Sequence, residues 1–132
     1  MKNVALFVAL GISSAAASQA AVAADAQMVA AEAKLNEGLP MMVDDDTRLD
    51  RVSLAPDERV IIYHNTFVKN ESNLIDPAKF KRQATPWMRS KVCADKSMTP
   101  LFKKGATTRY SFSASNGRYI GAIDITPADC GF

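Results

Sequence analysis

The two cysteines of this chain, Cys93 and Cys130, constrain its fold more than any other feature. They are far apart in sequence, unlike the C-x-x-C pairs of redox catalysts, so we interpret them as structural. With only two cysteines, an intramolecular disulfide has a single possible pairing. Two free thiols, or a bridge between two copies of the chain, are the alternatives. The bond would hold the C-terminus in place, because Cys130 is third from the end.

An export signal at the N-terminus favours the disulfide, because exported proteins fold in oxidising compartments. Lys2 supplies a positive charge, residues 4–12 form a short apolar run, and Ala21-Val22-Ala23 matches an A-x-A cleavage pattern. We therefore expect residues 1–23 to be a signal peptide cleaved after Ala23, with Ala20 as the weaker option. A retained N-terminal helix is the alternative. The mature protein is expected to be periplasmic or secreted.

The same sequence bears on membrane attachment. A bacterial lipoprotein carries a cysteine directly after its cleavage site, and no cysteine precedes Cys93, so we expect no lipid anchor. No later apolar stretch approaches the roughly 20 residues of a transmembrane helix. We therefore expect no transmembrane segment and a soluble mature chain. Residues 24–132 suffice for a single domain with one modest core.

Charge is distributed unevenly along this domain. The acidic residues of its first part are Asp44, Asp45, Asp46, Asp50, Asp57 and Glu58. The basic residues of its later part are Lys79, Lys81, Arg82, Arg89, Lys91, Lys96, Lys103, Lys104, Arg109 and Arg118. A basic patch can bind nucleic acid or anionic lipid. Interleaved aromatic residues are missing and an acidic segment can complement the patch, so we interpret it as solvated surface and expect no nucleic-acid partner.

Local patterns predict the first half of the domain. Residues 24–37 read as a helix ended by Gly38, of which residues 24–35 are expected to be loosely ordered. Residues 48–54 alternate imperfectly as a strand. Residues 59–68 are dense in β-branched and aromatic side chains and predict a second strand. Because both of its faces carry apolar groups, we expect that strand at the centre of the sheet.

Three helix starts follow, at Asp76-Pro77, Thr85-Pro86 and Thr99-Pro100, each with a capping side chain before a proline. Pro86 could instead lie inside one longer helix. Residues 107–113 and 118–126 read as strands joined by an Asn116-Gly117 hairpin turn. This order predicts an α+β fold, with a mainly antiparallel β-sheet of about four strands, three to four flanking helices and one disulfide.

Several spaced elements resemble the small exported bacterial proteins grouped as quorum-sensing-regulated virulence factors. The elements are Leu39-Pro40, Val43-Asp44, Thr47-Arg48-Leu49-Asp50, Tyr63, Cys93, Gly105, Tyr110-x-Phe112, Gly117 and Asp129-Cys130, and they cover residues 36–130. Members of that family are similar in fold to the α/β pilotins of type II secretion, which escort an outer-membrane secretin. The resemblance implies a helix-flanked antiparallel sheet, a disulfide, no enzyme activity and no catalytic residues. Pilotins are commonly lipidated, and the cysteine for lipidation is missing here.

Motifs for catalysis are not evident. His64 is the only histidine and lies within a predicted strand, which favours a hydrogen-bonded sheet residue over an acid–base role. The sequence does not match a calcium-binding EF-hand loop at the aspartates Asp44, Asp45, Asp46 and Asp50. Arg48 stands at the fifth position of such a loop, and the sixth position has no glycine. We expect no cofactor and no metal. Paired carboxylates for a hydrolase remain an alternative, since acidic residues alone define no geometry.

Two classes of function follow. The first is an exported, soluble, non-catalytic interaction protein that presents a groove between sheet and helices to a protein or peptide partner. Its candidate surface residues are Tyr63, His64, Phe67, Trp87 and Met88, although large apolar residues at such spacings usually face a core. A pilotin-like secretion-system accessory protein is one alternative within this class. The second class is a carboxylate-dependent hydrolase. An exposed apolar groove in the structure would favour the interaction protein. A pocket that holds His64 beside two acids would favour the hydrolase.

Overall fold

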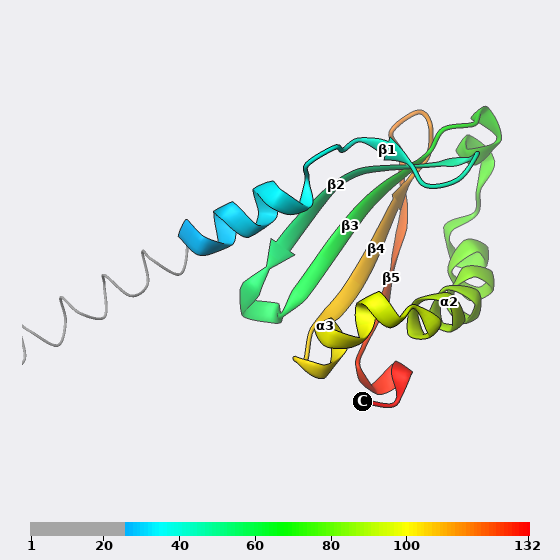
Figure 1. Ribbon diagram of the computed structural model, residues 1–132. Coiled ribbons are helices and arrows are strands. Elements are labelled where there is room, and N and C mark those ends of the chain that lie inside the picture. The colour runs from blue at the N-terminus through cyan, green and yellow to red at the C-terminus, as the bar shows by residue number, and fades with distance from the viewer. Residues whose placement is uncertain (1–25) are drawn as a thin grey trace, which may run out of the picture. The chain divides into compact units, whose positions relative to one another are not determined.

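The computed structural model describes residues 26–132 and divides the chain into two units, Met1–Leu35 and Asn36–Phe132. In the first unit, residues 26–35 are helical, within the range predicted for a helix. The expected signal peptide, residues 1–23, lies outside the described residues. The second unit contains a sheet and the helices that pack on it (Figure 1).

A five-stranded sheet is the frame of the second unit, with its strands in the order β1-β2-β3-β4-β5. The strands are β1 (Met41–Met42), β2 (Thr47–Ala55), β3 (Val60–Phe67), β4 (Thr107–Ser113) and β5 (Tyr119–Ile125). A short helix, η1 (Pro56–Glu58), joins β2 to β3. The central place of β3 agrees with the prediction from its two apolar faces.

The sheet is mixed and has one strand more than predicted. β3 and β4 run parallel, and the other neighbouring pairs are antiparallel. A parallel pair requires a long crossover connection, which the helical segment between β3 and β4 supplies. That segment holds η2 (Asn70–Leu74), α2 (Pro77–Ala94), η3 (Lys96–Met98) and α3 (Thr99–Lys103). The additional strand, β1, has only two residues, too few for an alternating pattern to appear in the sequence.

Helix α2 is one continuous helix with Pro86 inside it, so the separate helix start predicted at Thr85-Pro86 is wrong and the longer-helix alternative is correct. Proline has no N–H to donate to the carbonyl one turn earlier. The Thr85 hydroxyl donates to the Lys81 carbonyl at 2.6 Å in this turn. The predicted start at Asp76-Pro77 is confirmed, because the Asp76 carboxylate accepts the Lys79 N–H at 2.9 Å.

Two further local predictions differ in outcome. Thr99 is the first residue of α3 rather than its cap, because Met98 occupies the capping position and makes no side-chain capping bond. The hairpin between β4 and β5 is confirmed at Asn116-Gly117. Gly117 has a φ of 87°, which few other residues adopt, and the Asn116 side chain accepts the Arg118 N–H at 3.0 Å. The sequence therefore predicted this hairpin correctly, because the residues of the turn alone decide its conformation.

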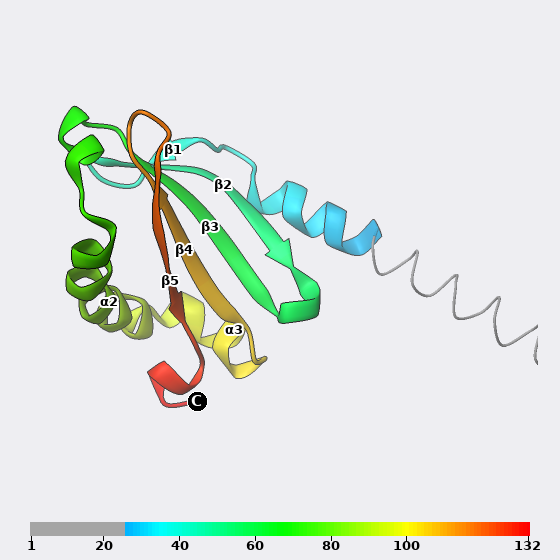
Figure 2. The ribbon, with the colours of Figure 1, turned by 180° about the vertical axis from the view of Figure 1, so that it is seen from behind.

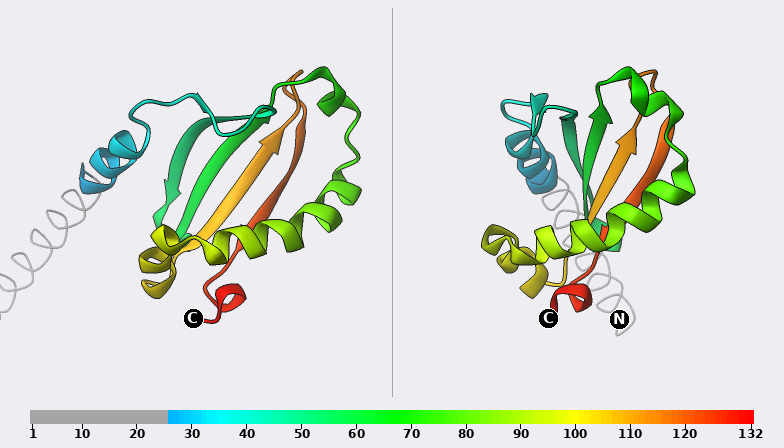
Figure 3. Two further views of the ribbon diagram at one scale, coloured as in Figure 1. Left: turned by 45° about the vertical axis from the view of Figure 1, so that its right-hand side comes forward. Right: turned by 90° about the vertical axis from the view of Figure 1, so that its right-hand side faces the viewer.

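The core lies between the sheet and the helices that cross one of its faces (Figures 2 and 3). Its buried members are Met88, Phe102, Phe112, Ala114, Ile120, Ile123 and Ile125. Met88 comes from α2 and Phe102 from α3, while the others come from β4, β5 and the turn between them. Burial is thus concentrated at the β4–β5 side of the sheet, and the β2–β3 side of the same face is covered less.

The predicted disulfide joins Cys93 to Cys130, and the described residues contain no free cysteine. It connects the C-terminal end of α2 to η4 (Ala128–Cys130), the last helical turn of the chain. Arg89 of α2 and Asp129 of η4 add an ion pair with an N–O distance of 3.5 Å. The C-terminus is therefore attached to α2 near its C-terminal end.

Candidate functional site

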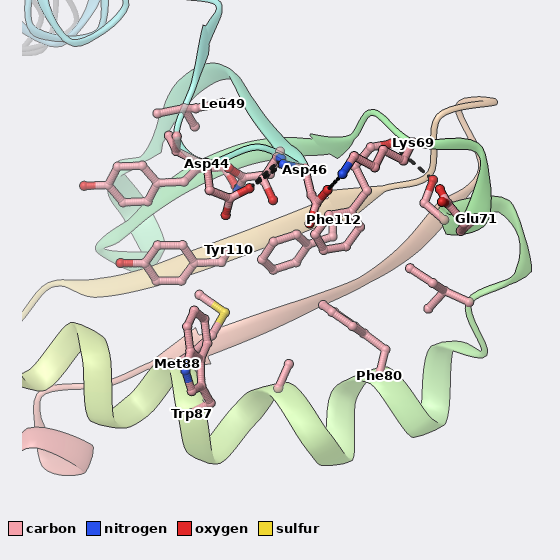
Figure 4. Close-up of a pocket in the computed structure, with 18 residues that line it drawn as sticks. Asp44, Asp46, Leu49, Lys69, Glu71, Phe80, Trp87, Met88, Tyr110 and Phe112 are labelled. Atoms are coloured by element: carbon pink, nitrogen blue, oxygen red, sulfur yellow. Dashed lines mark hydrogen bonds and ion pairs between the residues drawn. The ribbon is translucent and has the colours of Figure 1, made fainter.

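A groove of about 840 Å³ opens between α2 and the uncovered part of the sheet. It exists because α2 packs mainly along β5, at one edge of the sheet, and stands apart from β2 and β3. Residues of β2, β3 and β4 line its floor, residues of α2 line one wall, and the β1–β2 loop and η2 meet at one end (Figure 4). Most lining side chains are apolar, which suits an apolar ligand surface.

Two pairs of stacked aromatic rings form the floor. Tyr63 of β3 stacks on Tyr110 of β4, with ring centroids 5.1 Å apart and planes 9° from parallel. Phe67 stacks on Phe112 at the same centroid distance with planes 10° apart. The parallel pairing of β3 and β4 places these rings side by side, since Tyr63 is the register partner of Tyr110. The floor is thereby a flat, rigid aromatic surface.

The α2 wall is also apolar. Phe80 meets both phenylalanines of the floor edge-on, with centroids 5.7 Å from Phe67 and 5.2 Å from Phe112. Ala84 and Met88 continue the wall, and Trp87 stands at its rim with 61% of its surface exposed. The Lys91 ammonium lies over the indole ring, 5.4 Å from its centroid. An exposed tryptophan beside an apolar groove is an effective contact for a ligand, because it offers a large area at little entropic cost.

The β1–β2 loop forms an acidic end of the groove. The Asp44 carboxylate accepts the N–H groups of Asp46 at 2.8 Å and Thr47 at 2.7 Å. These bonds, the one from Asp46 first, lower the pKa of Asp44. Asp46 pairs with Lys69 at 2.5 Å, and its carbonyl accepts the Val68 N–H at 2.9 Å. Together these contacts hold the loop against the start of η2.

At the other side of this end, η2 is fastened to the β4–β5 turn. The Ser72 hydroxyl donates to the Phe67 carbonyl at 3.1 Å and accepts the Ser115 N–H at 2.9 Å. The Arg118 guanidinium donates to the carbonyls of Asn73 at 3.1 Å and Ile75 at 2.9 Å. Such bonds to a charged donor are stronger than neutral ones. The groove is therefore preformed at this end, where the β1–β2 loop and η2 are tied to the sheet.

The tyrosines of the floor remain neutral in ordinary conditions. Burial raises the pKa of Tyr110 to about 12, and burial with the nearby charge of Asp95 raises that of Tyr63. Both phenols therefore present hydroxyl groups and no charge to a ligand. The groove lining offers apolar contact, a few hydroxyls and one acidic end.

His64 lies on the opposite face of the sheet. Successive residues of a strand point to alternate faces, so His64 points away from the face that holds Tyr63. Its Nε2 lies 2.7 Å from the Ser53 hydroxyl oxygen of β2. Nearby, Asp50 accepts the Thr66 hydroxyl at 2.6 Å and Arg48 at 2.5 Å. Burial opposes ionisation of Asp50, but these two bonds, together with the charges of Arg48 and His64, outweigh it and lower the pKa of Asp50.

The structure thus brings together Tyr63, Phe67, Trp87 and Met88 of the five residues expected to form an interaction surface, and places His64 elsewhere. The alternation along residues 59–68 already separates His64 from Tyr63 and could have excluded it. Sequence reasoning missed other lining residues, namely Leu49, Ile75, Phe80, Tyr110 and Phe112. The described residues include no cluster of three or more histidine, cysteine or acidic side chains able to hold a metal ion.

Comparison with known proteins identifies a shared fold but no family. No family model matches the chain, and no curated protein matches its sequence significantly. Among solved structures, a Pseudomonas aeruginosa protein inferred to be secreted has a TM-score of 0.64 at 13% identity, over 79% of this chain and 89% of that one. The pilotin EpsS of the Vibrio vulnificus type 2 secretion system has a TM-score of 0.61 at 18% identity, over 80% of this chain and 92% of that one.

A second pilotin, AspS of the Vibrio cholerae type II secretion system, has a TM-score of 0.56 at 16% identity, over 75% of this chain and 84% of that one. At these identities the likeness concerns the fold alone. The pilotin-like fold implied by the sequence resemblance is therefore found. Among residues 26–132, no helix is both long and apolar enough to cross a membrane.

Proposed function

We propose that this protein is an exported, non-catalytic binding protein whose groove takes a segment of a partner protein. The observation that carries the proposal is the preformed apolar groove with Trp87 exposed at its rim. Apolar surface left open to water costs free energy, so a groove of this size with one anchored end is typical of a binding site. Its volume and aromatic floor fit several side chains of a polypeptide.

The structural neighbours support two finer forms of this proposal. Two of them are pilotins of type II secretion systems, which supports a secretion-system accessory protein. The third is inferred to be secreted, which supports an exported factor, and the sequence resemblance adds an association with virulence. The identity of the partner separates the two forms, since the same groove serves either.

A carboxylate-dependent hydrolase is the less favoured function. Its histidine would have to be His64, which lies on the face opposite the groove. Three acids line the groove, Asp44, Asp46 and Glu71. The first accepts backbone N–H groups and the second pairs with Lys69, in positions that stabilise a loop. We therefore propose no chemical step.

The test is site-specific photocrosslinking in the producing bacterium. A photoreactive phenylalanine analogue replaces Trp87 at the groove rim, and the matched control places it at Arg51, an exposed residue of β2. We expect one discrete adduct with another exported or envelope protein from position 87 and none from position 51. Mass spectrometry of the adduct then identifies the partner and the crosslinked segment. Equal adducts from both positions, or none from position 87, would refute the groove as the binding site.

A further inference from the structure

The two edges of the sheet differ in how their backbone groups are satisfied. At the first edge, β1 pairs with part of β2, and the Asn36 side chain covers Val52 further along. The Asn36 amide accepts the Val52 N–H at 2.8 Å and donates to the Val52 carbonyl at 2.7 Å. At the other edge, β5 has a neighbouring strand on one side only (Figure 2). A free strand edge of this kind can pair with another extended chain.

The backbone groups that β5 directs outward follow from the geometry of β2. Val52 lies on the groove face with its register partner Tyr63, and its N–H and C=O point away from the sheet. β5 runs in the same direction as β2 but forms the opposite edge. In β5 the outward groups therefore belong to residues whose side chains lie on the other face. These are Ala122 and Asp124, which alternate with the core residue Ile123.

A cavity of about 610 Å³ lies along this edge, and we call it the edge cleft. Its lining includes residues 119–124 of β5 and, from α2, Ala78, Lys81 and Thr85, which share one side of the helix at i, i+3 and i+7. Gly121 leaves open space where a side chain would stand. An extended segment of five residues spans about 17 Å, close to the length of β5 that the cleft exposes. Between a strand edge and a helix, such a segment can bind its main chain to the strand and its side chains to the helix.

Lys81 gives the edge cleft its charge. The Lys81 side chain is exposed, and within residues 26–132 it forms no ion pair. Arg109 also lines the cleft, but its guanidinium donates to the Asp124 carboxylate at 2.8 and 3.1 Å, so these two charges offset each other. Helix α2 contributes no acidic residue between Pro77 and Ala94. An acidic side chain on a bound segment would therefore complement Lys81.

A second copy of this chain fits the edge cleft less well. Antiparallel pairing of two β5 edges about a two-fold axis would place both α2 helices side by side on one face of the joined sheet. Each helix carries five basic side chains and no acidic one, so the two helices would repel each other. A partner with acidic residues meets no such repulsion.

We propose that the edge cleft binds an extended, acidic segment of a partner protein as a sixth strand beside β5. Ala122 and Asp124 pair with its main chain, and Lys81 binds its acidic side chain. Tyr119, which is 60% exposed, offers apolar contact at one end of the cleft. The proposal does not rest on the groove function, because Phe80 is the only described residue that lines both sites.

The test begins with phage-displayed random peptides of about seven residues, selected on the protein purified after export. We expect enriched peptides in which an acidic residue stands among β-branched ones. The best of them is synthesised, and amide hydrogen exchange is measured by NMR with and without it. The amides of Ala122 and Asp124 should exchange more slowly by about tenfold or more, because they become hydrogen-bonded donors. A peptide bound in the groove would leave these two amides unchanged.

A charge reversal supplies the mutational arm. Lys81→Glu should lower affinity for the acidic peptide by about fivefold or more, from the loss of one ion pair and a new repulsion. Replacing the acidic residue of the peptide by lysine should restore binding to this variant. The matched control, Lys79→Glu, changes the net charge equally at an exposed position of α2 outside the cleft. Far-UV circular dichroism verifies that both variants fold, and crosslinking from position 87 reports the groove separately.

The main-chain arm uses peptides with N-methyl groups on alternate residues. Methylation of one alternate set should abolish binding and methylation of the other should not, because an added strand pairs through one edge only. No enriched peptide, equal effects of the two methylated sets, or equal loss in the two lysine variants would overturn the proposal. Slow exchange of the Ala122 and Asp124 amides at high protein concentration without peptide would also overturn it and assign the edge to a second copy.

Discussion

At the scale of single residues, Asp44 shows how one carboxylate shapes an end of the groove. It accepts two consecutive backbone N–H groups where β2 begins, and the pKa of Asp44 is lowered in consequence. A group whose pKa is lower in the folded state adds stability that is complete above its unfolded pKa of about 3.9 and is lost as the pH falls through the folded value. The ionised form therefore holds the loop at neutral pH.

We predict that Asp44→Asn, which keeps the acceptor oxygen but removes the charge, lowers the free energy of unfolding by roughly 0.5 kcal/mol at pH 7. The difference from the wild-type protein should shrink as the pH falls below about 4 and vanish near pH 2. Urea unfolding across this pH range measures it. Asp45→Asn removes the same charge from the same loop and is the control. An identical pH-dependent difference in both variants would contradict the role of the hydrogen bonds.

At the scale of elements, the disulfide connects α2 with the C-terminal turn η4. It closes a loop with a sequence separation of 37 residues, which in the chain-entropy model stabilises the folded state by about 3–4 kcal/mol. We predict that Cys93→Ser with Cys130→Ser lowers the melting temperature, while the groove still binds its partner in folded protein. Calorimetry and crosslinking from position 87 measure the two effects. Loss of binding with an intact fold would show that the bond serves the site directly.

Pro86 is a second element-scale feature, because it interrupts the hydrogen bonding of α2 at an exposed position. We predict that Pro86→Ala raises the free energy of unfolding by about 1–2 kcal/mol, since the helix regains a backbone donor, less the entropy that proline removes from the unfolded chain. Chemical denaturation measures the change. Ser90→Ala on the same exposed side should give only a few tenths of a kcal/mol. A gain no larger than that of the control would mean that the turn at Pro86 carries no strain.

The elements also show what a sequence can and cannot predict. The β3 strand, the Asp76-Pro77 helix start and the Asn116-Gly117 turn were predictable because neighbouring residues decide them. The parallel pairing of β3 with β4 was not, since it depends on where a long crossover returns the chain. Pro86 was ambiguous because a proline suits the first turn of a helix and is sometimes tolerated within one.

At the scale of the whole molecule, the groove arises from uneven coverage of the sheet. Tyr63 and Phe67 could be proposed from sequence as large apolar residues of one strand face, but Tyr110 and Phe112 join them only through the parallel pairing. Sequence could not tell whether these rings would face a closed core or an open groove. The answer depends on the position of α2 along β5, which no local pattern encodes.

The whole-molecule prediction concerns filling this groove. Ala84 is a half-buried wall residue of α2 in the groove, so Ala84→Leu would place a larger apolar side chain over the aromatic floor. Covering that floor should raise the free energy of unfolding by about 1 kcal/mol, because apolar area leaves water without displacing packed atoms. The same side chain would occupy ligand space and lower partner affinity by tenfold or more. Thermal melting measures the first effect, and crosslinking yield at several protein concentrations measures the second.

Gln83→Leu is the matched control, because it adds an apolar side chain one residue away at an exposed position outside the groove. It should leave partner binding unchanged and give no comparable gain in stability. The opposite changes in stability and binding expected of Ala84→Leu are what distinguish a ligand groove from an imperfectly packed core. In a core, overfilling would destabilise the fold by about 1–3 kcal/mol. Unchanged partner affinity in Ala84→Leu would place the binding site elsewhere on the molecule, even if the variant were more stable.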